Sequence, residues 1–323
     1  GVHPTTAAQK INAQYALSVL NAPARVGLVS AAATSSGASF ANTLSQYVPQ
    51  SGDQTWHVYG DVSHAKRDWE TGSSQPTSFL LGADYRIGAK NNTRLGVTLG
   101  NQHITGNFDA NSGSFKLNEP NASVYVSQNR AHNGWIAYMR YGRLNADIQR
   151  NITLGSAQRT ESGSTKGSHI TLGAQGHWDL GTAMDGKIQH GPIARLAYEK
   201  VHLKAYDEQS DSSTAMSFGE QNRKGWVGSV GYQVKGTFGQ IKPYAALSYE
   251  FDNTRSDDLR ARLKSAASSF ARSGVTVGNG AKAQVGMQVQ LAPNVDLNVS
   301  AAQTFARSSG KETSLNVGVN AKF

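Results

Sequence analysis

From Thr55 to the end of the chain, apolar and polar residues alternate in a long series of segments. In the stretch TWHVYGDVSHA, Val58 and Val62 lie on one face, and Asp61 and Ser63 lie on the other. A period of two is typical of a β-strand whose two faces meet different surroundings. The pattern predicts about twelve strands, at residues 55–65, 77–89, 93–105, 116–129, 134–148, 166–180, 186–206, 216–237, 241–253, 278–291, 295–307 and 312–323.

The lengths of these segments and of their connections favour a membrane-spanning barrel. Many segments exceed the five or six residues that are usual for strands in soluble proteins. Their lengths match the roughly 9–11 residues that a tilted strand needs to cross a membrane. Short connections alternate with longer polar ones, which are predicted at 66–76, 106–115, 149–165, 207–215 and 254–277; the last connection, 308–311, is short as well. Outer-membrane barrels have this asymmetry, with tight periplasmic turns and longer loops outside. An even number of strands places both chain termini of the barrel, the start of its first strand and the end of its last, on the periplasmic side.

The polar faces of the segments favour a hydrated interior. They carry charged and amide side chains among many glycines, and we expect these to line the lumen and contact a plug: Asp84, Arg86, Arg94, Arg140, Arg195, Gln284 and Gln288. Aromatic residues near the strand ends are candidates for interface girdles. A soluble two-sheet sandwich or a propeller is the alternative. The strand lengths and the aromatic residue at the end of the last strand argue against it.

The first 50 residues have a different composition and a helical pattern. They contain no Asp or Glu and are rich in Ala and Ser. Thr6 to Leu20 has helical spacing, and a second helix is predicted from Ala24 to Tyr47, with Gly27 and Gly37 as weak points. The segment PQSGD at 49–53 is interpreted as a linker.

Composition excludes several classes of protein and site. The chain has no cysteine, which excludes disulfides and Cys-based metal sites, and the nine histidines show no metal-ligand spacing. We expect no metal and no cofactor, because phosphate-loop and dinucleotide fingerprints are absent too. The net charge of +9 comes from scattered basic residues rather than a compact face, so nucleic-acid binding is not expected. No apolar run is long enough for a transmembrane helix.

Two features of the chain resemble the C-terminal end of a GDSL-type (SGNH) esterase autotransporter, a type V secretion protein. The block from Val2 to Ile11, VHPTTAAQKI, resembles the last block of that esterase family, and His3 falls on its catalytic histidine. The second feature is a C-terminal barrel that ends in Asn320-Ala321-Lys322-Phe323. In such barrels the final aromatic residue, here Phe323, is the signal for barrel assembly.

The resemblance implies a fold, a division into domains and a function. Residues 1–22 would be the remnant of the passenger esterase's last helix, 23–52 a linker and lumen helix, and 53–323 an all-β transmembrane barrel of about 12 antiparallel strands. This translocator domain would anchor and help export an N-terminal esterase or lipase passenger. The catalytic Ser and Asp of the family have no counterpart in this sequence, so His3 is expected to be inactive here.

The resemblance also implies partners and a location. The partners would be outer-membrane lipid and lipopolysaccharide, the barrel assembly machinery, periplasmic chaperones and the chain's own passenger. The location would be the Gram-negative outer membrane, with the passenger at the cell surface. A porin-like channel is an alternative function, and so is a surface adhesin that acts through outside loops. The loop at 254–277 is the main candidate for adhesion, with its basic residues Arg255, Arg260, Arg262, Lys264 and Arg272.

Overall fold

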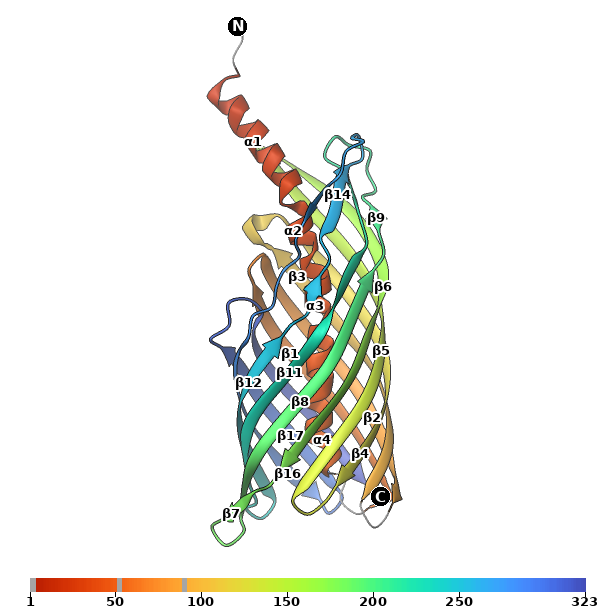
Figure 1. Ribbon diagram of the computed structural model, residues 1–323, viewed down its shortest axis with the longest axis vertical. Coiled ribbons are helices and arrows are strands. Elements are labelled where there is room, and N and C mark those ends of the chain that lie inside the picture. The colour runs from red at the N-terminus through yellow and green to blue at the C-terminus, as the bar shows by residue number, and fades with distance from the viewer. Residues whose placement is uncertain (1–3, 51–53, 89–91) are drawn as a thin grey trace.

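Twelve long strands form a closed antiparallel barrel in the computed structural model, which describes residues 4–50, 54–88 and 92–323 (Figure 1). The long strands are β1 (Trp56–Trp69), β2 (Gly72–Gly88), β3 (Thr93–Phe108), β4 (Gly113–Asn129), β5 (Asn133–Leu154), β6 (Ala157–Trp178), β8 (Ile188–Leu203), β11 (Gln221–Gly236), β12 (Ile241–Asp252), β16 (Gly280–Ala292), β17 (Val295–Phe305) and β18 (Lys311–Lys322). Each strand pairs with its neighbours in sequence. The predicted number of strands and their antiparallel order are confirmed.

The barrel closes where its first strand meets its last. β1 and β18 are antiparallel partners from His57 opposite Lys322 to Asp68 opposite Lys311. At the end of the barrel where β1 begins and β18 ends, the backbones of Trp56 and Phe323 exchange two hydrogen bonds, of 2.9 and 2.8 Å. Closure is required because unpaired strand edges have no water to bind within the hydrocarbon.

A chain of helices enters the barrel from one end and runs down its interior (Figure 1). These elements are α1 (Thr6–Leu20), α2 (Ala22–Val26), α3 (Leu28–Ala33), α4 (Ser35–Tyr47) and the short 3-10 helix η1 (Val48–Gln50). The hydroxyl oxygen of Thr5 caps α1 by accepting a hydrogen bond from the backbone N–H of Ala8. The second helical stretch is broken at Gly27, as the sequence indicates, and at Thr34. Gly37 was expected to be a weak point, but it lies within α4.

No single helix among the described residues is long and apolar enough to span a membrane. Two helical stretches, Thr6–Leu20 and Ala22–Tyr47, pass that test only together, with a bend of 41° between them.

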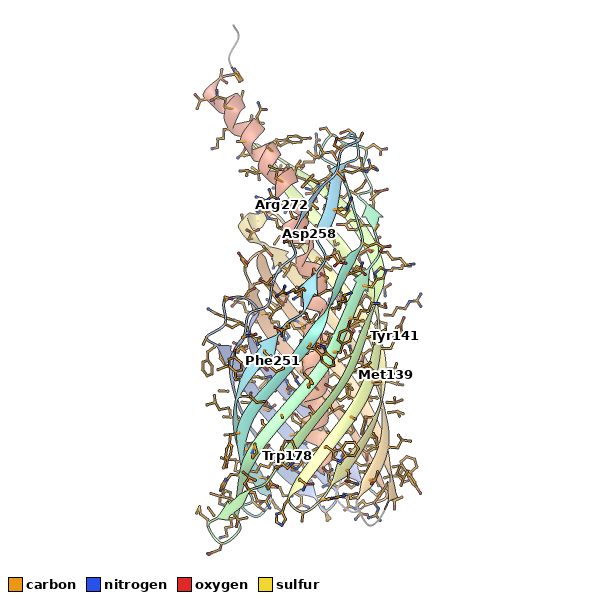
Figure 2. The ribbon with its side chains drawn as sticks, viewed as in Figure 1. Met139, Tyr141, Trp178, Phe251, Asp258 and Arg272 are labelled. Atoms are coloured by element: carbon orange, nitrogen blue, oxygen red, sulfur yellow. The ribbon has the colours of Figure 1, made fainter. Side chains whose placement is uncertain are left out.

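Apolar side chains cover the outer face of the barrel over its lower part. Val97 and Leu99 of β3, for example, are 54% and 67% exposed. Aromatic side chains flank this band. Trp56, Trp135 and Trp178 lie near its periplasmic edge, and Figure 2 shows Tyr141 and Phe251 well above Trp178. An outward apolar band with aromatic edges is the surface that a bilayer requires.

Three of the predicted outside loops are wrong, because the strands continue through them. β1 continues to Trp69 and β2 begins at Gly72, so only two residues of the predicted loop 66–76 lie between strands. Of the predicted loop 106–115, only residues 109–112 lie between β3 and β4. β5 and β6 form a hairpin that turns at Gly155 and Ser156, within the predicted loop 149–165. The barrel wall therefore projects far beyond the aromatic side chains at its outer edge.

In this projecting part, the apolar residues of the wall point inward. On β5, Leu144 and Ile148 are buried, whereas Arg143 and Asp147 are exposed. The reversal has a physical cause: outside the bilayer the outer face meets water, while the inner face packs against α2 and α3. The predicted arrangement, with the apolar face outward and the polar face inward, therefore holds in the lower part of the barrel and reverses on β5 above it.

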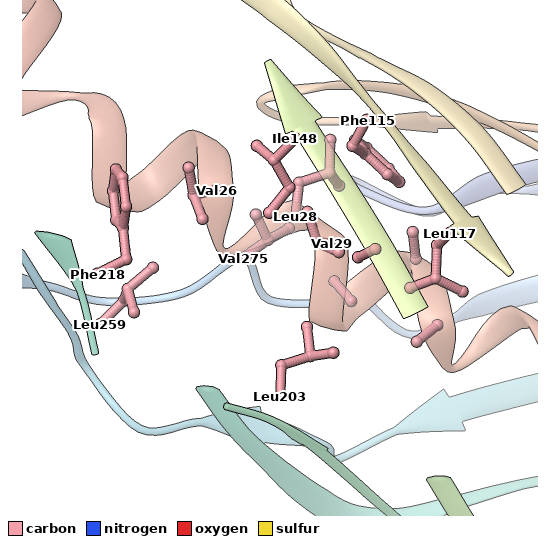
Figure 3. Close-up of a cluster of buried hydrophobic side chains, with 14 of the residues drawn as sticks. Val26, Leu28, Val29, Phe115, Leu117, Ile148, Leu203, Phe218, Leu259 and Val275 are labelled. Carbon is pink, nitrogen blue, oxygen red and sulfur yellow. The ribbon is translucent and has the colours of Figure 1, made fainter. Parts of the chain in front are cut away.

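The predicted loop at 254–277 is also partly ordered as strands. Its short strand β13 (Arg255–Ser256) pairs with β11 at the edge of the main wall. The strands β14 (Leu259–Leu263) and β15 (Phe270–Arg272) lie above the main wall, with β9 (Tyr206–Asp207) and β10 (Met216–Phe218). Near the periplasmic end, β7 (Gly181–Ala183) pairs with β8. β15, β14, β10 and β9 form a separate four-stranded sheet. Its inner face supplies Phe218 and Leu259 to the apolar cluster around Val26 and Leu28 (Figure 3).

A charged residue in the middle of the apolar band is expected to destabilise the barrel. Val97 lies between Leu95 and Leu99 on the outer face of β3. The substitution Val97→Arg should lower the free energy of unfolding by about 2–4 kcal/mol, because the guanidinium has no partner in hydrocarbon. Urea titration of the chain in phospholipid vesicles measures this difference.

The matched control is Gln149→Arg, on the exposed face of β5 beyond the apolar band. It should change the free energy of unfolding by less than about 1 kcal/mol. Equal effects of the two substitutions would contradict the assignment of the band to the bilayer.

Candidate functional site: the helix inside the barrel

The first strand of the barrel binds the inner helix α4 through polar side chains. Asp61 accepts hydrogen bonds from the hydroxyls of Thr43 and Tyr47, each at 3.1 Å. One turn earlier, the hydroxyls of Ser39 and Ser63 are 2.9 Å apart. Asp61 and Ser63 alternate with outward-facing residues on β1, so the strand pattern itself points them at the helix.

Four buried ionisable side chains, one from each of β4, β5, β6 and β8, face the start of α4: Glu119, Arg140, His169 and Glu199. Ser36 lies 3.0 Å from Nδ1 of His169, and the same nitrogen lies 3.0 Å from Oε1 of Glu119. Arg140 pairs with Glu119 at 2.9 Å. A Cβ atom on Gly37 would lie 2.3 Å from Oε1 of Glu199, so a larger residue would require the Glu199 side chain to shift.

Aromatic contacts seat the same helix against the wall. The rings of Tyr47 and Tyr59 stack at 5.3 Å with an angle of 6° between their planes. Phe40 meets Tyr138 edge-on at 5.2 Å. These rings belong to a buried cluster that also includes Leu44 of α4. The side of α4 that carries them is therefore packed rather than solvated.

Amide side chains from several strands also bind the helix. Gln175 of β6 donates to the backbone carbonyl of Ala41 at 3.1 Å, and Asn129 of β4 donates to that of Val48 at 3.2 Å. Gln46 of α4 donates to the hydroxyl of Ser300 on β17 at 2.8 Å. The polar partners thus come from widely separated parts of the barrel wall, which fixes the helix in rotation as well as in depth.

A polar cavity remains between the top of α4 and the part of the wall that is formed by β8 to β18 and β1. Thr34 and Ala38 line it on the helix side. On the wall side, Arg307 pairs with Glu250 at 3.0 Å, and Arg67 pairs with Glu312. The other charged residues that line this cavity are Arg195, Glu199, Asp252 and Lys282. The lumen is therefore filled unevenly, by a helix on one side and by charged side chains on the other.

The structure brings some of the predicted lumen residues together and separates others. Asp84 and Arg94 form a buried ion pair near the periplasmic end, and Arg86 lies opposite Arg94 in the strand register. Arg94 also donates to the backbone carbonyls of Gln54 and Thr55, at 2.8 and 3.2 Å. This pair therefore holds the segment that leads into β1.

The remaining predicted residues have other positions. Arg140 contacts the helix directly, with its guanidinium 5.9 Å from the ring centre of Phe40. Gln284 donates to the hydroxyl of Tyr244 on the neighbouring strand, and Gln288 is buried in the wall. Phe323 is 64% exposed at the periplasmic edge. His3 lies outside the described residues.

Sequence reasoning missed the residues that bind α4 most directly, namely Asp61, Ser63, His169 and Ser300. Asp61 and Ser63 stand on the polar face of the first predicted strand, which was the available signal. His169 gives no signal in the sequence, because its partners Glu119 and Glu199 are far away along the chain. Within the described ranges, no group of three His, Cys, Asp or Glu side chains is arranged to hold a metal ion.

Outside the barrel, the β5–β6 hairpin and the loop at 208–215 hold α1. The side chain of Gln14 accepts a hydrogen bond from the backbone N–H of Gly155 at 2.7 Å, and the hydroxyl of Tyr15 donates to the carbonyl of Ser213 at 2.8 Å. The loop is fixed in turn by Lys264, whose ammonium donates to Asp211 at 2.8 Å. This hydrogen bond and the positive charge of Lys264 lower the pKa of the exposed Asp211 carboxyl.

A family model described as the autotransporter β-domain matches residues 57–302. The chain belongs to the autotransporter β-domain family. It is an outer-membrane translocator domain, and its barrel with an inner helix is the fold of that family. The translocator domain of the autotransporter NalP from Neisseria meningitidis has the same fold, with a TM-score of 0.70 and 18% identity. That alignment covers 90% of this chain and 98% of the NalP domain.

Two relatives carry names of ester-cleaving enzymes. Lipase 1 of Photorhabdus luminescens is 28% identical over 345 residues, which cover 99% of this translocator chain and 49% of the lipase. Esterase EstA of Pseudomonas aeruginosa is 26% identical over 274 residues, which cover 80% of this chain and 42% of EstA. The translocator chain thus spans about half the length of the curated relatives that it matches.

The position of α4 predicts one specific disulfide. Because the hydroxyls of Ser39 and Ser63 are 2.9 Å apart and the chain has no cysteine, Ser39→Cys with Ser63→Cys should form a disulfide on mild oxidation. The cross-link would make the mobility of the oxidised protein in gel electrophoresis differ from that of the reduced protein.

The control pair is Ser45→Cys with Ser63→Cys, because Ser45 lies on the exposed side of the same helix. This pair should stay reduced under the same conditions. Cross-linking of both pairs to the same extent would show that the helix rotates or slides in the barrel.

Proposed function

We propose that the helices α2, α3 and α4 act as both plug and tether of this translocator domain. In this proposal the barrel anchors an N-terminal passenger and helps its export, and α1 leads out to that passenger at the cell surface. The observation that carries the proposal is the set of side-chain contacts between α4 and the wall, above all those of Asp61 with Thr43 and Tyr47. A helix that only passed through a wide pore would not need matched partners on several strands.

A helix is well suited to this role on physical grounds. It satisfies its own backbone hydrogen bonds, so it can occupy the lumen without adding a strand to the wall. Small residues along α3 and α4 keep it narrow, and Gly37 lets it approach Glu199. The apolar cluster around Val26 and Leu28 closes the outer part of the barrel above it.

We propose further that the passenger is an esterase or lipase of the GDSL type. The names of the relatives support this, and so does the block from Val2 to Ile11, in which His3 falls on the family's catalytic histidine. In this proposal residues 1–22 belong to the end of the passenger, 23–52 to the linker and plug, and 53–323 to the barrel. The relatives' unmatched half leaves room for the missing Ser and Asp of a triad.

We also propose that Phe323 takes part in assembly of the barrel. It is exposed at the end of β18, the strand that closes the barrel against β1. An exposed terminal aromatic side chain in this position suits recognition by the barrel assembly machinery, after periplasmic chaperones have kept the chain unfolded.

Deletion of the plug should open the pore. A chain without residues 1–48 loses α1 to α4, and its single-channel conductance in planar lipid bilayers should rise several-fold over that of the full chain. Circular dichroism and heat-dependent gel mobility would establish that the shortened barrel is folded. An unchanged conductance of a folded barrel would contradict the plug.

The chain by itself should not hydrolyse esters. A histidine without its nucleophile and its orienting carboxylate cannot carry out the acyl-transfer cycle. Release of nitrophenol from a short-chain nitrophenyl ester should therefore be the same for the chain and for its His3→Ala variant. Turnover that disappears in the His3→Ala variant would contradict the proposed division between passenger and translocator.

A further inference from the structure

A row of three basic side chains crosses the outer face of the barrel on adjacent strands. Lys200 of β8 lies directly opposite Lys224 of β11, and Lys224 lies directly opposite Arg255 of β13. All three side chains are exposed. Their neighbours in sequence Val201 and Arg223 are buried, so the alternation of the strands places the basic groups on the outer side of the wall.

This row lies immediately outside the aromatic edge of the apolar band. Tyr198 and Trp226 are paired in the same register two residues below Lys200 and Lys224, and therefore on the same face. Their rings are 5.4 Å apart, and Trp226 is 51% exposed. Aromatic side chains of this kind sit at the level of the lipid headgroups. The basic groups thus lie where the headgroups of the outer leaflet meet water.

In the part of the chain that the structure describes, none of the three positive charges forms an ion pair, although the exposed Asp257 is two residues from Arg255. Among the described residues, no carboxylate lies within ion-pair distance of Lys200, Lys224 or Arg255, although thirteen such pairs occur elsewhere. Like charges directly opposite each other on neighbouring strands destabilise a sheet. The row contains two such pairs, Lys200 with Lys224 and Lys224 with Arg255. An anion bound from outside would relieve the repulsion between these charges.

Further basic side chains lie two strands away, across β6, and on the sheet above the row. On β5, Arg143 is exposed two residues beyond Tyr141, which also lies at the outer aromatic edge. Above the row, Arg260 and Arg262 line a surface hollow on the four-stranded sheet, together with the carboxylate of Asp207. The sheet is an outward extension of β8 and β11, since β9 follows β8 and β10 precedes β11 in the chain. Figure 2 shows Arg272, of the same sheet, above the level of Tyr141 and Phe251.

We infer that Lys200, Lys224 and Arg255 form a binding site for the phosphate groups of lipid A, the membrane anchor of lipopolysaccharide. The inference rests on the outer-membrane location of the family and does not depend on the identity of the passenger. Lipid A presents two phosphates on a sugar pair whose acyl chains enter the bilayer. Its chains would cover the apolar band below Tyr198 and Trp226, and its phosphates would then reach the basic row.

Titration of the full chain in non-ionic detergent with purified bisphosphorylated lipid A tests the inference, with bound lipid measured by native mass spectrometry. Each basic group near an anionic lipid surface contributes about fivefold to affinity, so the variant Lys200→Gln/Lys224→Gln/Arg255→Gln should bind on the order of 100-fold more weakly. The single variant Lys224→Gln should lose about fivefold, and it serves as the test if the triple variant fails to fold.

The control variant Lys116→Gln/Lys187→Gln/Lys242→Gln removes the same total charge at exposed positions away from the row. It should keep the affinity of the unchanged chain within about twofold. Lipid A from which both phosphates have been removed should bind the unchanged chain as weakly as bisphosphorylated lipid A binds the triple variant. Equal losses in the two triple variants, or equal binding of lipid A with and without phosphates, would overturn the inference.

Discussion

The structure depends on one constraint, which is that every backbone polar group within the hydrocarbon must find a partner in the protein. The pairing of β1 with β18 meets this constraint by removing both free edges of the sheet. Closure then fixes the rest of the arrangement. One face of each strand must meet lipid, and the other surrounds a lumen that water or protein can fill. A helix can fill it because its own backbone is already satisfied.

The filling of the lumen follows two different physical rules along the barrel axis. At the level of the bilayer, the helix is held by polar side chains of the wall, such as Asp61 and His169, and by stacked aromatic rings. Above the bilayer, the same helical segment is held by apolar packing around Val26 and Leu28. The polar part positions the helix through specific partners, while the apolar part excludes water. The two parts of the helical segment are therefore held by different sets of contacts.

The number of strands and their faces were predictable because alternation is a local property of the sequence. The strand ends were not, because the side that is apolar switches beyond Tyr141, where Leu144 and Ile148 turn inward. A pattern that reverses its phase resembles the start of a loop. The helix contacts were only half predictable. Asp61 is on a polar strand face, but its choice of Thr43 and Tyr47 depends on how α4 leans on the wall. That lean is set by distant pairs, such as Gly37 with Glu199 and Tyr47 with Tyr59.

The central claim is that side chains of the wall hold α4 firmly inside the closed barrel. Hydrogen–deuterium exchange of the full chain in lipid nanodiscs measures this most directly, because it reports the opening of each backbone hydrogen bond. Amides of α4 should be protected as strongly as those of the barrel strands, whereas α1, which has no buried residue, should exchange much faster. Exchange of α4 as fast as that of α1 would contradict the account.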